Sequence, residues 1–217
     1  MTGHFKVYVG AQPYLDGPVE PVPTLVIDAD SDKLVEVSAH HASIASHHPL
    51  SVVEAVLAST DKEILAWYQF NDSRLNGSLD LETWSHIYPN VTVVNQSERD
   101  ARALDSLLDE WQIRQVALPP YGKIVLSQGD HVKSLSGLVN WESRIVSMSV
   151  CGPSAEQIWI SRLNPMLSSR GFQSETGAAH WQKDPLLSAL RENQQLKKKL
   201  ECAQQILDSI LSGLPGN

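Results

Sequence analysis

Apolar residues recur along this chain in two alternating patterns, one typical of strands and the other typical of helices. Short apolar or β-branched runs predict strands, and runs without polar alternation predict strands buried on both faces of a sheet. Such runs occupy residues 5–9, 25–28, 51–57, 63–70, 91–94, 123–126 and 144–150. Longer stretches with apolar residues three or four positions apart predict amphipathic helices. These stretches begin near Asp30, Ala101, Gly129 and Ala155.

The strand and helix patterns alternate, which is typical of an α/β fold. We expect a mainly parallel, doubly wound (Rossmann-like) sheet with helices on both faces, formed by residues 1–183. Asn95 is expected to end the strand over 91–94, and the helix from Ala101 is expected to reach Trp111. Four prolines lie between residues 13 and 23. Because proline cannot continue a helix, a loop is expected in place of a first helix.

The C-terminal segment, residues 184–214, has a different pattern, the heptad repeat of a coiled coil. Apolar residues occupy eight of the nine a and d positions, and the ninth, an a position, holds Asn193. The a positions are Leu186, Asn193, Leu200, Leu207 and Leu214, and the d positions are Ala189, Leu196, Ala203 and Ile210. A single Asn at an a position commonly fixes the register of two-stranded coils. We expect a homo-oligomer through residues 186–214; the alternative is one amphipathic helix that packs back on the body.

Composition and charge narrow the range of partners and compartments. The chain has 217 residues, of which 42% are hydrophobic and 19% charged, as in a globular protein. Its net charge of −8 argues against the basic surface that nucleic-acid binding requires. No apolar run approaches the ~18 residues of a membrane span, and no secretory signal is evident. The two cysteines, Cys151 and Cys202, form no disulfide framework, so we expect a cytoplasmic protein.

Two strand ends carry polar groups that could bind a ligand. Asp28 ends the run at 25–28, where a carboxylate could accept hydrogen bonds from ribose hydroxyls. Residues 126–138 have the pattern of a strand, a glycine turn and a helix, where open α/β sheets present ligand-binding groups. Within this stretch His131, beside Asp130, could act as a base near neutral pH. The alternative is a helix-capping Asp130 and a solvent-facing His131.

Two further segments are rich in polar residues. The turn-rich segment 70–78 could line a substrate mouth or form a plain surface loop. Histidines lie at positions 40, 41, 47 and 48, but no pair has the i, i+4 spacing of metal ligands on a helix. We therefore expect no metal site.

Several short motifs resemble those of one enzyme family. Residues 7–11, Val-Tyr-Val-Gly-Ala, stand where that family has Asp-Val-Gly-Ala, and residues 27–30, Ile-Asp-Ala-Asp, where it has Phe-Glu-Pro-Asp. Residues 103–108, Ala-Leu-Asp-Ser-Leu-Leu, match Thr-Leu-Asp-x-Leu-Leu, and residues 126–130, Leu-Ser-Gln-Gly-Asp, match Asp-Val-Gln-Gly-Asp. Over about residues 5–190 the chain thus resembles the FkbM-type methyltransferases, a branch of the class I enzymes that use S-adenosylmethionine.

The resemblance implies a methyltransferase sheet, S-adenosylmethionine as the cofactor, and O-methylation of a small-molecule or glycan acceptor such as a sugar or natural product. It places Gly10, Ala11 and Asp28 at the cofactor, and Asp130 and His131 near the acceptor. We therefore expect these five residues to lie around one ligand-binding site.

The chain departs from the family's pattern at positions that would carry chemistry. Tyr8 stands at the acidic position of the first strand, and Leu126 replaces the Asp of the later motif. The cofactor-binding motif is therefore degenerate. Two functions follow: an FkbM-like O-methyltransferase with impaired cofactor binding, or a catalytically inactive scaffold (a pseudoenzyme). Such a scaffold would oligomerise through its tail and bind a glycan or a partner enzyme.

Overall fold

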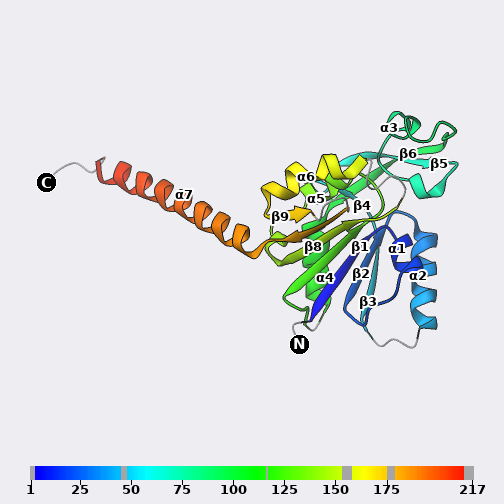
Figure 1. Cartoon of the computed structure of the whole chain (residues 1–217), viewed down its shortest axis with the longest axis horizontal. Helices are drawn as coiled ribbons and strands as arrows, with labels where there is room; N and C mark the ends of the chain where they lie inside the picture. Colours follow the sequence, from blue (N-terminus) through cyan, green and yellow to red (C-terminus); the bar gives the residue numbers. More distant parts are fainter. Residues whose placement is uncertain (1–2, 45–47, 116, 153–157, 175–178, 213–217) are drawn as a thin grey trace.

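A computed structural model describes residues 3–44, 48–115, 117–152, 158–174 and 179–212 (Figure 1). Its body is a layered α/β domain, from which one long helix extends (Figure 1). Three features of the sequence analysis lie outside the described residues: the start of the helix expected from Ala155, His47, and the heptad position Leu214.

Seven strands form the central sheet, in the order β3-β2-β1-β7-β8-β10-β9. They are β1 (His4–Val9), β2 (Thr24–Asp28), β3 (Leu50–Glu54), β7 (Tyr121–Leu126), β8 (Ile145–Val150), β9 (Phe172–Ser174) and β10 (His180–Lys183). The first five strands in this order pair in parallel, whereas β10 is antiparallel to both of its neighbours. The predicted mainly parallel α/β sheet is confirmed.

Helices cover both faces of this sheet. Side chains alternate between the two faces along each strand, so the apolar strands present residues on both faces that have to be covered. The helices are α1 (Gln12–Asp16), α2 (Ser31–Ser43), α4 (Leu104–Arg114), α5 (His131–Ser136) and α6 (Ile160–Ser169). On one face Tyr8 and Val26 pack with buried residues of α1 and α2. On the other face Val7, Val9 and Ile124 pack with buried residues of α4, α5 and α6. The core is therefore divided by the sheet into two layers.

A second sheet has three strands in the order β4-β6-β5 and lies at the upper right in Figure 1. It contains β4 (Val56–Ala58), β5 (Ile64–Phe70) and β6 (Val93–Ala103), with η1 (Ser73–Leu75) and α3 (Leu81–Ser85) between the last two. The expected end of a strand at Asn95 is wrong. β6 continues to Ala103 because its polar residues pair with β5, as Glu98 does with Ala66.

Two local expectations about helices also need correction. The segment after Gly10 is not a loop but forms the single helical turn α1, with a proline in its first turn, where a missing N–H costs nothing. The helix expected from Ala101 begins at Leu104, because residues 101–103 pair with β4. Asp105 then fixes this helix: its buried carboxylate accepts the N–H groups of Val139 and Asn140, at 3.0 and 2.7 Å.

The tail forms one helix, α7 (Pro185–Ser212), which begins directly after β10 and runs away from the body (Figure 1). The Asp184 carboxylate accepts the Leu186 N–H at 2.8 Å and so caps its first turn. Leu186, Leu196 and Leu200 are 69%, 62% and 67% exposed, so these residues do not pack back on the body. The tail is thus helical over residues 185–212, and its pairing as a coiled coil stays a prediction. Among the described helices, none is long and apolar enough to cross a membrane.

Candidate functional site

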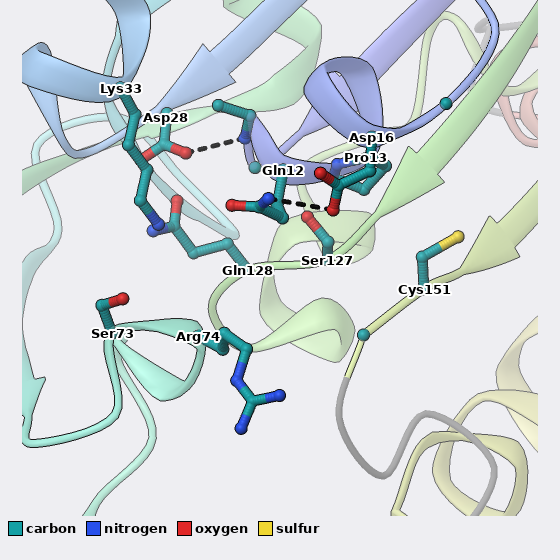
Figure 2. A pocket seen from close by; sticks show the side chains of 14 residues that line it. Gln12, Pro13, Asp16, Asp28, Lys33, Ser73, Arg74, Ser127, Gln128 and Cys151 are labelled. Atoms are coloured by element: carbon teal, nitrogen blue, oxygen red, sulfur yellow. Dashed lines mark hydrogen bonds between the residues drawn. The ribbon is translucent and has the colours of Figure 1, made fainter. Parts of the chain in front are cut away.

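A cavity of about 470 Å³ opens at the carboxyl ends of the parallel strands (Figure 2). Its walls come from the last residue of β2, from residues that follow β1, β7 and β8, and from α1, α2 and η1. After β1 the chain crosses toward β2 and β3, whereas after β7 it crosses toward β8. The cavity therefore lies at the switch point of the sheet, where open α/β folds bind ligands.

Gly10 allows the turns after β1 and β7 to approach each other closely. Its φ angle is +100°, and a Cβ at this position would lie 2.1 Å from Ser127 Oγ. The Ser127 N–H in turn donates to the Val9 carbonyl at 2.8 Å, which holds the two strand ends together. A larger residue at position 10 would push these turns apart, so glycine is required by the wall of the cavity itself.

Asp28 places a buried carboxylate in the cavity wall, with 1% of the residue exposed. Its oxygens accept the Ala11 N–H at 2.7 Å and the Asp30 N–H at 2.9 Å. Desolvation raises the pKa of Asp28 and outweighs these two bonds, the charge of Lys33 and a hydrogen bond from the Gln128 side chain, which lower it. A carboxylate has about four lone-pair sites, so one remains for a ligand hydroxyl beside these three donors. A buried carboxyl with a raised pKa beside a cavity is typical of a functional site.

The remaining polar groups of the cavity carry both signs of charge. Lys33 extends from α2 past Asp28 toward Gln128, and Arg74 lines the cavity from η1 with its guanidinium directed away from Asp28 and Gln128 (Figure 2). The Arg74 guanidinium is oriented by hydrogen bonds of 2.6–3.2 Å to both oxygens of Asp72. Asp16 provides a second carboxylate, which accepts the Gln12 amide at 2.9 Å. The cavity thus suits a polar ligand that carries charges of both signs.

The structure brings together the residues expected at the cofactor but not those expected at the acceptor. Gly10, Ala11 and Asp28 all line the cavity, whereas Asp130 and His131 are not among its described lining residues. The Asp130 carboxylate caps α5 and accepts the N–H groups of residues 132 and 133, at 2.9 and 3.2 Å. The catalytic role of Asp130 and His131 stays a prediction, and their placement does not support it.

His131 is buried rather than solvent-facing. It is 2% exposed, and its ring lies against Trp159, with a centroid distance of 4.1 Å. Its Nδ1 atom has no hydrogen-bond partner in the part of the chain that the structure describes. Burial lowers the pKa of His131 to about 3, so the ring is neutral at physiological pH and cannot take up a proton there.

Several cavity residues were not named individually from the sequence. Ser127 and Gln128 lie in the stretch 126–138 that was expected to present ligand-binding groups, and Cys151 directly follows β8, so the strand-end argument that identified Asp28 applies to all three. Ser73 and Arg74 come from the turn-rich segment 70–78, so part of this segment lines the cavity, and its role at a substrate mouth stays a prediction. The side chain of Leu126, in contrast to these cavity-lining residues, is fully buried in the core.

The histidines at the end of α2 form a packing cluster. The Tyr14 hydroxyl and His41 Nδ1 are 2.8 Å apart, and the rings of His41 and His48 meet edge to face at 4.6 Å. Within the described ranges, no group of three or more His, Cys, Asp or Glu side chains is placed to hold a metal ion.

No family model matches the chain, and no curated protein or solved structure matches it either. The family that the motifs suggest is therefore not shown, and the function has to be argued from the cavity.

The buried His131 predicts a specific loss of stability in acid. Its pKa of about 3 in the folded protein lies below the ordinary value of 6.5. Between these values the unfolded chain binds the extra proton, so the free energy of unfolding falls as pH decreases, by up to about 1.4 kcal/mol per pH unit. His131→Phe should therefore lose about 2 kcal/mol less than the wild type between pH 7 and pH 5 in urea unfolding.

His86→Gln, at an exposed histidine, is the control and should keep the wild-type dependence on pH. A His131→Phe protein that loses stability in acid as steeply as the wild type would show that His131 is not buried in its neutral form.

Proposed function

We propose that this chain is a class I methyltransferase-like domain that binds S-adenosylmethionine in the cavity at the ends of β1, β2, β7 and β8. The observation that carries the proposal is Asp28, a buried carboxylate held at the end of β2 despite a raised pKa. Its position relative to the glycine turn after β1 is that of a ribose-binding acid in nucleoside-binding α/β folds.

The architecture of the sheet supports the proposal. The crossing between β1 and β7 places the cavity where such folds hold a nucleoside. The antiparallel strand β10, inserted between β8 and β9, also fits the sheet arrangement of class I methyltransferases. Together with the motifs at residues 7–11 and 27–30, this arrangement favours a methyltransferase-like ancestry over other doubly wound folds.

The residues present fit the cofactor in size and in chemistry. The cavity volume of about 470 Å³ lies within the range of small-molecule sites. Asp28 would accept a ribose hydroxyl, and the turn at Gly10 and Ala11 would approach the cofactor through its backbone. S-adenosylmethionine supplies the methyl group, and its transfer requires alignment of donor and acceptor more than acid–base help. The acceptor we propose is a small molecule or glycan.

One observation favours the second candidate function, an inactive scaffold. Leu126, at the family's acidic position, is buried in the core and offers no polar group to either substrate. Asp130 is engaged as a helix cap, and His131 is neutral. The carboxylates that do line the described part of the cavity are Asp16 and Asp28. A cofactor or a related nucleoside could thus be bound without efficient methyl transfer.

Calorimetric titration with S-adenosylmethionine tests the proposal. We expect saturable binding by the wild type and binding weakened about 10- to 100-fold by Asp28→Asn, because a charged hydrogen-bond acceptor is worth about 1.5–3 kcal/mol. Asp105→Asn is the matched control: it also alters a buried carboxylate that accepts backbone N–H groups, but one outside the described cavity lining.

The Asp105→Asn protein should retain the wild-type affinity, and thermal melting should confirm that both variants are folded. Absence of heat at millimolar S-adenosylmethionine would contradict cofactor binding and leave the scaffold function as the better account. Equal affinity of the wild type and Asp28→Asn for S-adenosylmethionine would show that Asp28 does not bind the cofactor.

We also propose that the chain self-associates through the apolar stripe of α7. The described a and d residues of this stripe are exposed, and exposed leucines spaced in this way are covered in coiled coils. Replacing Leu196 and Leu200 together by Asp should convert the oligomer to a monomer in light scattering. Asp at the f positions, through Lys198→Asp and Gln205→Asp, should leave the oligomer intact. A monomeric wild type would refute self-association.

A further inference from the structure

The proposed self-association leaves open how two copies of α7 would be arranged. The stripe consists, among the side chains that the structure describes, of Leu186, Ala189, Asn193, Leu196, Leu200 and Ala203, all of them exposed. We infer that two copies pair through this stripe as a parallel, in-register coiled coil, with Asn193 facing Asn193 of the second copy. This inference rests on the proposed self-association and specifies its geometry.

Asn193 is the first reason for the parallel register. In a parallel, in-register pair the two Asn193 amides meet and can hydrogen-bond to each other inside the apolar seam. In an antiparallel pair an a residue faces d residues of the second copy, and every d position of this stripe is apolar. A parallel pair shifted by one heptad places Asn193 against Leu186 or Leu200. Both alternatives bury an unpaired amide, at a cost of about 1–3 kcal/mol.

The lysines are the second reason. Lys197, Lys198 and Lys199 lie near the middle of α7, which spans residues 185–212. A fully overlapping antiparallel pair would bring the two lysine runs opposite each other, and like charges at this distance repel. In the parallel register Lys199, at a g position, faces the neutral Gln204 at the e position of the second copy.

The start of α7 determines where the two cavities would lie. β10 is antiparallel to β8, so the chain leaves the sheet at the edge opposite the cavity. Asp184 fixes this exit: its N–H donates to the Gly171 carbonyl at 2.9 Å, and its carboxylate accepts the Gln173 amide at 2.8 Å. In a parallel pair both domains lie at one end of the coil, and both cavities lie on the edge away from it.

Disulfide trapping distinguishes the two orientations in the full chain. The background carries Cys151→Ser and Cys202→Ser, so that no native thiol interferes. Leu186→Cys is then added at the first a position, and mild oxidation should link the two copies, because facing a positions lie within the roughly 4.4–6.8 Å Cα separation of disulfides. Lys198→Cys, at an f position, should stay unlinked.

Light scattering on the same samples measures whether the chain is a dimer or a monomer, and so distinguishes a wrong orientation from a lack of self-association. In a fully overlapping antiparallel pair residue 186 lies beside residue 211 of the second copy. The two copies of residue 186 are then about 38 Å apart, from 25 residues at about 1.5 Å each, so a dimer without cross-linking would overturn the parallel register alone. A monomer would overturn self-association as well. Asn193→Leu should raise the melting temperature of the assembly but yield mixed oligomers, because no polar pair then excludes other registers. A uniform dimer for that variant would contradict the role of Asn193.

Discussion

The hydrogen bond from the Ala11 N–H to the Asp28 carboxylate is the contact on which the candidate site depends. It ties the turn that leaves β1 to the end of β2, at 2.7 Å, in a place closed to solvent. Gly10, pressed against Ser127, joins the same turn to the end of β7. Three strand ends are thereby held around one cavity. The arrangement buries a carboxylate whose pKa is raised, a local cost that proteins commonly retain where it serves a function.

Much of the fold could be predicted because the central strands are covered on both faces. The runs at 25–28 and 123–126 had to be apolar for that reason, and their ends had to meet at one edge of the sheet. This reasoning identified Asp28 as a strand-end carboxylate, and the resemblance to methyltransferase motifs added Gly10 and Ala11 to the same site. The full length of β6 could not be predicted in this way. Its residues are mostly polar and exposed, and its pairing with β5 depends on contacts between distant parts of the chain.

The errors in the predicted composition of the candidate site also come from contacts between distant parts of the chain. The burial of His131 depends on contact with Trp159. Because Trp159 lies 28 positions further along the chain, the local sequence around His131 does not predict this contact. Arg74 lines the cavity from the connection between β5 and β6, so its position relative to Asp28 is set by the second sheet rather than by local sequence. Where a side chain follows a strand end, the sequence is informative; where it arrives from an insertion, only the packing places it.

The two proposed functions rest on different residues of the domain. Asp28 supplies a buried carboxylate where the proposal places a ribose, whereas Leu126, at a position where the resembled family has an acid, is buried in the core. The proposed enzyme requires this cavity to hold a nucleoside cofactor, whereas the inactive scaffold does not. Occupancy of the cavity by a nucleoside is therefore the claim that separates the two functions.

Labelling of the two native cysteines by a maleimide tests this claim most directly. Cys151 lines the cavity, whereas Cys202 is exposed on α7 and serves as the internal control. Saturating S-adenosylmethionine should slow modification of Cys151 at least several-fold, measured by mass spectrometry of the two peptides, and leave Cys202 unchanged. An unchanged rate at Cys151 with millimolar S-adenosylmethionine would contradict occupancy of the cavity.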